Sequence, residues 1–176
     1  MTPPRLTLQP HPDSATSPAQ TVWAVASRDA GVLALRFVLE GRLDDLLIPP
    51  QTAPTRTDNL WKHTCFEAFI RAPGETAYRE FNLSPSTAWA AYDFSAFRER
   101  APDPKTTVPR IEVVTTPHLE VSTRLDLSPI KGPWQVALTA VVESRDGALS
   151  YWSLHHPPGR PEFHHAAGFV LDLPSQ

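Results

Sequence analysis

Hydrophobic and polar residues alternate along much of this chain, with the period of two that is typical of half-buried β-strands. The pattern is clearest in residues 64–71, where Phe66, Ala68 and Ile70 take alternate positions and Glu67 lies between them. Segments of this kind predict strands that bury one face and present the other to solvent or to a second layer.

Turn-forming residues separate the alternating segments, which predicts a succession of short strands. The strands are expected at residues 5–9, 21–26, 32–39, 64–71, 78–84, 87–94, 108–116, 119–127, 135–144, 149–154 and 169–173. The first is expected at a sheet edge, and residues 43–48 could form either a strand or one helical turn. Single helical turns are expected at residues 59–63, with Asp58 as the N-cap, and at residues 95–100.

About ten strands, spaced by roughly 8–12 residues, predict an antiparallel β-sandwich with a jelly-roll or immunoglobulin-like topology. The chain shows neither an internal repeat nor an amphipathic helix of useful length. We expect one domain over residues 1–176, in which residues 1–20 form a partly extended, proline-rich segment.

Proline is unusually frequent, at 20 of 176 residues against an average of about 5%. Because proline is unfavourable in helix interiors and central strands, this composition indicates many loops and few long helices. The formal net charge is -3 and the 16 basic residues are scattered, so we expect no nucleic-acid partner. No apolar run approaches the roughly 20 residues of a membrane-spanning helix, and no membrane partner is expected.

The first residues lack the apolar stretch of a secretory signal, and the single cysteine, Cys65, excludes an internal disulfide. We therefore expect a cytoplasmic protein. Cys65 lies among apolar residues and is expected to be buried rather than reactive. The chain has no Gly-x-Ser-x-Gly elbow and no phosphate-binding glycine loop, so we expect neither enzymatic activity nor a cofactor.

Two side chains stand out as candidates for ligand binding. Trp61 precedes a predicted strand, where a core residue is not expected. It could pack as an aromatic lid over the end of the sandwich or offer its flat face to a ligand. Glu67 lies among apolar residues, so its carboxyl must be paired, solvated in a groove or protonated. An ion pair with Arg71, Arg79 or Arg124 is the alternative to a ligand-binding role.

Glu80 and Asn82 share one face of the next predicted strand. If that strand pairs with residues 64–71 as a hairpin, Glu67 joins them in a polar row suited to hydroxyl-rich ligands. Glu67 and Glu80 could also be paired as the carboxylates of a glycoside hydrolase, although their spacing does not require it.

Five of the seven histidines fall in two stretches, at His63, His155, His156, His164 and His165. Neighbouring histidines on an extended backbone point in opposite directions, so each adjacent pair offers at most one ligand to a metal. One histidine from each pair, with His63, could make a three-imidazole zinc site. The spacing matches no compact ligand motif, and we therefore expect no metal.

Three stretches carry a family resemblance. They are Trp61-x-His63-Thr64-Cys65-Phe66-Glu67-x-Phe69, Glu80-Phe81-Asn82-x-Ser84-Pro85-Ser86-x-x-Trp89-Ala90-x-Tyr92 and Tyr151-Trp152-x-Leu154-x-His156-Pro157. In these stretches the chain resembles the bacterial DOMON-like proteins, which are related to the family-9 carbohydrate-binding modules. The resemblance spans residues 33–173 and implies a β-sandwich whose pocket holds a sugar or a haem.

The resemblance implies aromatic stacking on a sugar ring, with carboxylates, amides and arginine binding its hydroxyls. Trp61 and Glu67 match the first aromatic residue and the acidic residue after it, while Phe163, His164 or His165 stands where a second tryptophan would lie. We expect a non-enzymatic module for a carbohydrate or a similar polar ring compound. Its expected ligand-binding residues are Trp61, His63, Glu67, Glu80, Asn82, His156, Phe163 and His164, with Trp152 packed in the core.

The alternative is a haem- or metal-binding protein on the same fold. The resemblance implies an axial methionine with histidine or lysine for haem, and Met1 is the only methionine. A haem would therefore need two histidines, His63 with His156 or His164. An interaction domain without a pocket is the third possibility.

Overall fold

The computed structural model describes residues 3–175, which form twelve strands and three short 3-10 helices. The elements in chain order are β1 (Leu6–Pro10), β2 (Ala19–Asp29), β3 (Val32–Gly41), η1 (Leu43–Asp45), η2 (Leu60–Lys62), β4 (Cys65–Arg71), β5 (Tyr78–Leu83), β6 (Trp89–Ala96), β7 (Glu99–Arg100), β8 (Ile111–Val114), β9 (Leu119–Asp126), β10 (Trp134–Glu143), β11 (Leu149–Ser153), η3 (Ala166–Gly168) and β12 (Leu171–Leu173). None of the helices in this range is long and apolar enough to span a bilayer.

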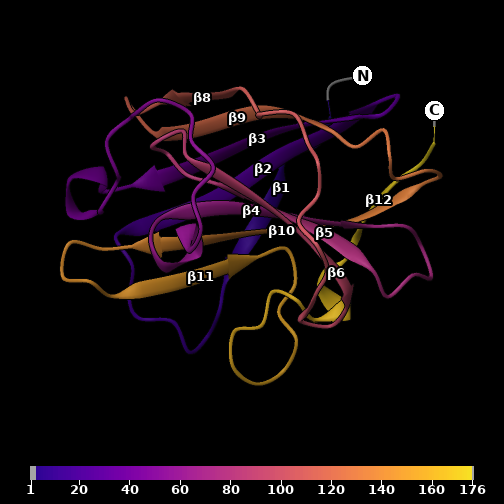
Figure 1. The fold of residues 1–176 in the computed structure, drawn as a ribbon. Helices are drawn as coiled ribbons and strands as arrows, with labels where there is room; N and C mark the ends of the chain where they lie inside the picture. The colour runs from indigo at the N-terminus through magenta and orange to yellow at the C-terminus, as the bar shows by residue number, and fades with distance from the viewer. Residues whose placement is uncertain (1–2, 176) are drawn as a thin grey trace.

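The strands form two layers that pack face to face (Figure 1). Sheet A has the order β1-β2-β3-β9-β8, and sheet B has the order β7-β6-β5-β4-β10-β11-β1, with β12 also paired to β10. All of the pairings between these strands are antiparallel. The predicted all-β antiparallel sandwich is therefore confirmed.

The core lies between the layers and is built from alternate residues of each strand. Phe37 of sheet A stacks on Phe66 of sheet B, with ring centroids 5.2 Å apart. Phe81 and Trp134 are fully buried in the same cluster, and Trp152 joins it as expected, with 4% of its surface exposed. Burial of side chains of this size is the largest favourable contribution to folding a sandwich of this kind.

The first strand lies at the end of each sheet, the edge position that the sequence predicts, but it belongs to both sheets. Leu6, Thr7 and Leu8 pair with β2, whereas Gln9 and Pro10 pair with β11. β1 thus passes from one sheet to the other and joins their ladders. The sequence does not show this crossover, because local alternation does not report which strands a segment pairs with.

The helical turn expected at residues 95–100 is not formed, so that prediction was wrong. β6 continues to Ala96, and a tight turn with Arg98 at φ 55° leads directly into β7. Residues 43–48, where the sequence left two options open, form the single 3-10 turn η1 at Leu43–Asp45. The hairpin at Arg98 carries two arginines to the outer face of sheet B, where both line a pocket.

Candidate ligand-binding site

The floor of the candidate site is the outer face of sheet B, the face turned away from the core. Strand alternation places Glu67 and Phe69 of β4 on this face, together with Glu80 of β5 and Tyr92 of β6. Glu67 lies opposite Asn82, and Glu80 lies opposite Tyr92, in the two ladders. The hairpin expected from the sequence is therefore present, in the register that forms a polar row.

A pocket of about 710 Å³ opens above this floor. One wall comes from η2 and the residues before it, a second from the β6–β7 turn, and a third from the loop that follows β11. The residues that line it are Asp58, Asn59, Trp61, Glu67, Phe69, Glu80, Tyr92, Phe94, Arg98, Arg100, Val141, Tyr151, Arg160, Pro161, Phe163 and His164.

The wall that carries Trp61 is anchored by the two residues that precede the indole. Asn59 adopts a left-handed conformation (φ 64°), which turns the chain into η2. Leu60 then packs on an apolar cluster on the outer face of sheet B, which includes Phe69 and Phe94. Trp61 stays 48% exposed beside the pocket. Its position beside open space favours the ligand-facing interpretation over a packed lid.

Asp58 does not cap this turn, which corrects the N-cap prediction. Asn59 precedes η2 and makes no side-chain cap hydrogen bond. Asp58 Oδ1 instead accepts a hydrogen bond of 2.7 Å from the Tyr92 hydroxyl and one of 3.2 Å from Arg56. The Tyr92 hydrogen bond holds the pKa of Asp58 below its usual value. The segment before Trp61 is thus tied to the floor.

Removing the Tyr92 hydroxyl should loosen this wall. We expect Tyr92→Phe to lower the free energy of unfolding by about 1–2 kcal/mol, because it deletes one hydrogen bond to a charged group while retaining the ring. Urea denaturation measures this change. A loss below about 0.3 kcal/mol, well under the ordinary range for such a bond, would show that the link does not hold the segment.

The second and third walls are fastened to each other. Arg98 of the β6–β7 turn forms an ion pair with Glu162 of the late loop, with 3.0 Å between Nη2 and Oε1. Glu162 Oε1 also accepts a hydrogen bond of 3.1 Å from the backbone N–H of His164. Phe163 packs edge-on against Tyr151, with ring centroids 6.0 Å apart. The loop is therefore held in place over the floor.

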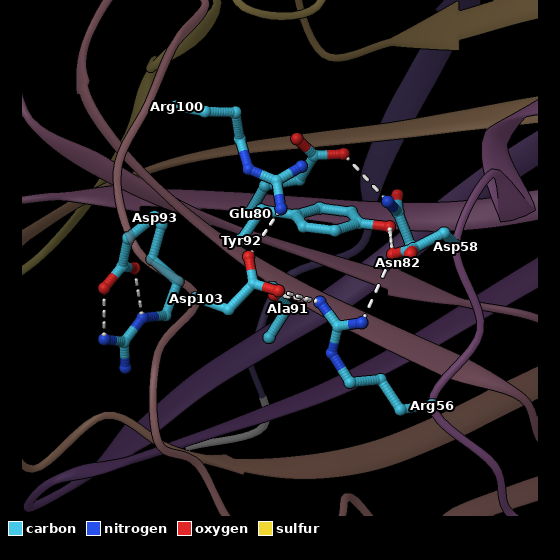
Figure 2. A network of polar contacts seen from close by, with 10 residues as sticks. Arg56, Asp58, Glu80, Asn82, Ala91, Tyr92, Asp93, Arg100 and Asp103 are labelled. Carbon is cyan, nitrogen blue, oxygen red and sulfur yellow. Dashed lines mark hydrogen bonds and ion pairs between the residues drawn. The ribbon is translucent and has the colours of Figure 1, made fainter.

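The side of the pocket formed by β6 and β7 is lined by two aromatic rings and two arginines: Tyr92, Phe94, Arg98 and Arg100. Arg100 lies over the ring of Tyr92, with its guanidinium carbon 4.0 Å from the ring centroid (Figure 2). Asp103 accepts hydrogen bonds of 2.5 Å from both Arg56 and Arg100. Arg100 is thus neutralised by a carboxylate at its back while its face covers an aromatic ring.

Two carboxyl groups are buried in the floor. Glu67 is 2% exposed and accepts a hydrogen bond of 2.9 Å from the Thr139 hydroxyl, and Glu80 is 4% exposed and accepts one of 2.8 Å from the Asn82 amide. Burial raises the pKa of Glu67 well above its usual value, and the neighbouring Glu80 raises it further. Burial also raises the pKa of Glu80 to about 7. The ion pairs considered for Glu67 are not formed: its hydrogen-bond partner is Thr139.

The structure brings together five of the eight residues expected at the site: Trp61, Glu67, Glu80, Phe163 and His164 all line the pocket. Asn82 is fully buried on the same face of β5 and donates a hydrogen bond to Glu80. Whether these side chains bind a ligand stays a prediction.

His63 and His156 lie outside the pocket lining. His63 is exposed and contacts Glu143, with 2.8 Å between Nδ1 and Oε2. His156 Nε2 contacts the backbone oxygen of Gln9 at 2.8 Å. Residues 3–175 contain no group of three His, Cys, Asp or Glu side chains arranged to hold a metal ion. The two-histidine haem site considered above would need His63, which is not at the pocket.

Sequence reasoning missed much of the lining. Tyr92 and Phe94 could have been found by extending the hairpin register by one strand, since Glu80 lies opposite Tyr92. Arg98 and Arg100 were hidden by the helical turn expected there. Arg160 lies in a loop, and no local sequence pattern marks it.

Comparisons with known proteins give the fold. No family model and no curated protein matches the chain. Among solved structures, a candidate carbohydrate-binding protein from Bacteroides uniformis superposes with a TM-score of 0.72 at 16% identity, over 98% of this chain and 86% of that one.

Two structures of a family-9 carbohydrate-binding module from Caldicellulosiruptor kristjanssonii also match. The complex with cellotriose has a TM-score of 0.60 at 11% identity, over 89% of this chain and 75% of that one. The complex with glucose has a TM-score of 0.56 at 12% identity, over 90% and 75%. The chain therefore has a β-sandwich fold similar to that of the family-9 carbohydrate-binding modules.

Proposed function

We propose that this protein binds a carbohydrate without transforming it. The observation that carries the proposal is the pocket itself: an exposed indole, Trp61, borders a cavity of about 710 Å³ whose floor holds two carboxyl groups. Its volume falls within the range of small-molecule sites, about 300–1,000 Å³.

The lining has the two kinds of surface that a sugar ring needs. A pyranose presents an apolar C–H face and a rim of hydroxyl groups. Trp61 and Phe163 supply flat aromatic surface for the face, and Glu67, Glu80 and Arg160 supply hydrogen-bonding groups for the rim. A mixed lining of this kind fixes both the plane of the ring and its rotation within that plane.

The fold supports the proposal. The family-9 modules that superpose on this chain were solved with cellotriose and with glucose. Carbohydrate-binding modules bind sugars and do not cleave them, which favours a binding role here. The resemblance to DOMON-like proteins belongs to the same proposal and rests on the sequence motifs.

A titration with sugars tests the proposal. We expect glucose or cellotriose to bind with a Kd of about 0.1–1 mM, the modest affinity that one stacked ring and a few hydrogen bonds supply. Isothermal titration calorimetry measures it, with glucitol as the matched control because this acyclic alcohol has the hydroxyls without the rigid ring. Binding of glucitol as tight as that of glucose, or no binding across a panel of monosaccharides and oligosaccharides, overturns the proposal. So does release of nitrophenol from aryl glycosides.

A further inference from the structure

His164 and Glu80 face each other across the pocket floor without touching. His164 Nε2 lies 3.8 Å from Glu80 Oε2, which is too far for a direct hydrogen bond. The other oxygen of Glu80 is occupied by Asn82, and the other nitrogen of His164 is occupied by Tyr78. Each residue thus has one polar atom pointing at the gap and no hydrogen-bond partner for it among residues 3–175.

The hydrogen bonds around Tyr78 determine which nitrogen of His164 carries the proton. The Tyr78 oxygen accepts a hydrogen bond of 3.1 Å from the backbone N–H of Arg98 and lies 2.8 Å from His164 Nδ1. Tyr78 is buried, and within residues 3–175 His164 Nδ1 is the one remaining acceptor for its hydroxyl proton. Tyr78 therefore donates to Nδ1, and the proton of the neutral imidazole lies on Nε2, toward Glu80.

Packing holds the imidazole in this orientation. The His164 ring lies edge-on to Phe69 and Phe94, with centroids 5.2 and 5.0 Å apart, and its backbone N–H is fixed by Glu162. Burial lowers the pKa of His164 to about 4, so the ring stays neutral at physiological pH. The pocket thus presents one N–H donor beside one carboxyl oxygen.

A single hydroxyl group fits this gap. An oxygen about 2.8 Å from both atoms completes a triangle on the 3.8 Å base. With Glu80 ionised, as it is above a pH of about 7, such an oxygen accepts from His164 Nε2–H and donates its own proton to Glu80 Oε2. An ether oxygen can only accept, and an ammonium group can only donate, so neither satisfies both partners.

We propose that Glu80 and His164 together select one hydroxyl group of the ligand, and that Tyr78 is the positioning residue that turns the His164 N–H toward it. This inference rests on the proposed carbohydrate binding and adds which chemical group is recognised. A buried site built for a hydroxyl discriminates against analogues that lack it, because its polar atoms are then left unpaired.

The test uses glucose and its singly deoxygenated and singly O-methylated derivatives, titrated calorimetrically into the protein at pH 8, where the Glu80 carboxyl is ionised. We expect one ring position at which both changes weaken binding at least about 30-fold in the wild type. Tyr78→Phe and Glu80→Gln should each reduce that discrimination to below about fivefold. His118→Ala is the matched control, because His118 contacts Glu120 on sheet A, and it should leave the discrimination unchanged.

A second readout needs no ligand. Nitrogen-15 NMR of the imidazole should show His164 as the Nε2–H tautomer in the wild type and a mixture of tautomers in Tyr78→Phe. An Nδ1–H tautomer in the wild type overturns the assignment, as does binding of every glucose derivative within threefold of glucose. The second result would leave carbohydrate binding intact, whereas no sugar binding at all would remove both proposals.

Discussion

Trp61→Ala should weaken glucose binding about 10- to 100-fold and barely change protein stability. Aromatic stacking contributes about 0.5–1.5 kcal/mol beyond the area it buries, and the area covered by the ring adds a similar amount. Trp61 is 48% exposed, and substitutions at exposed positions usually change the free energy of unfolding by less than about 0.5 kcal/mol. Calorimetry gives the affinity, and the ligand-induced change in tryptophan fluorescence should disappear.

Trp23 provides the matched control for that experiment. It lies on the outer face of sheet A, where its ring contacts Arg5 and Arg36, on the opposite side of the sandwich from the pocket. Trp23→Ala should leave glucose affinity unchanged. If Trp61→Ala instead destabilised the protein by about 2 kcal/mol or more, its indole would be a structural residue rather than a binding surface.

The second large effect concerns pH. Burial raises the pKa of Glu80 from 4.5 to about 7 in the folded protein, so the native state holds its proton more tightly than the unfolded chain. The contribution of the Glu80 carboxyl to the free energy of unfolding is fully present below pH 4.5, falls as the pH rises toward 7, and is lost above pH 7. A difference of about 2.5 between the pKa values corresponds to about 3 kcal/mol.

Glu80→Gln isolates this contribution, because glutamine keeps the shape and cannot ionise. At each pH we compare the free energy of unfolding of Glu80→Gln with that of the wild type. We expect this difference to shift in favour of the variant by about 3 kcal/mol between pH 4 and pH 8. The titratable and charged groups that face Glu80 are Glu67 on β4, Arg98 and Arg100 on the β6–β7 hairpin, and the neutral imidazole of His164 in the late loop. Among them, the two arginines favour the ionised form.

Urea denaturation across that pH range measures the difference. Glu75→Gln, in the exposed loop between β4 and β5, is the control and should follow the wild-type curve. Parallel wild-type and Glu80→Gln curves would mean that the Glu80 carboxyl ionises as easily in the folded protein as in the unfolded chain.

The floor of the pocket was predictable from the sequence because it depends on residues that are close together in the chain. The period-two pattern fixes which residues of a strand share a face, and the short β4–β5 connection fixes their pairing. Glu67, Glu80 and Asn82 could therefore be expected side by side if the two strands paired as a hairpin, and the structure shows that pairing. Cys65 was expected to be buried because its neighbours in the sequence are apolar, and this is confirmed, since it is fully buried.

The walls were not predictable in this way because their contacts join distant segments. Arg98 and Glu162 are 64 residues apart in the chain, and nothing near either residue identifies the other. Tyr78 and His164 are 86 residues apart, so the tautomer of the imidazole depends on a contact that local patterns cannot show. Asp58 was misassigned for a related reason: an acidic residue before a turn suits a helix cap as well as a distant tyrosine.

The crossover of β1 has a consequence for handling the protein. Residues Leu6–Pro10 supply the backbone hydrogen bonds that join the two ladders within residues 3–175. A chain trimmed to begin at residue 11 would leave one side of β2 and one side of β11 with unpaired N–H and C=O groups. Exposed strand edges recruit other chains, so such a truncation should self-associate even though the pocket residues remain.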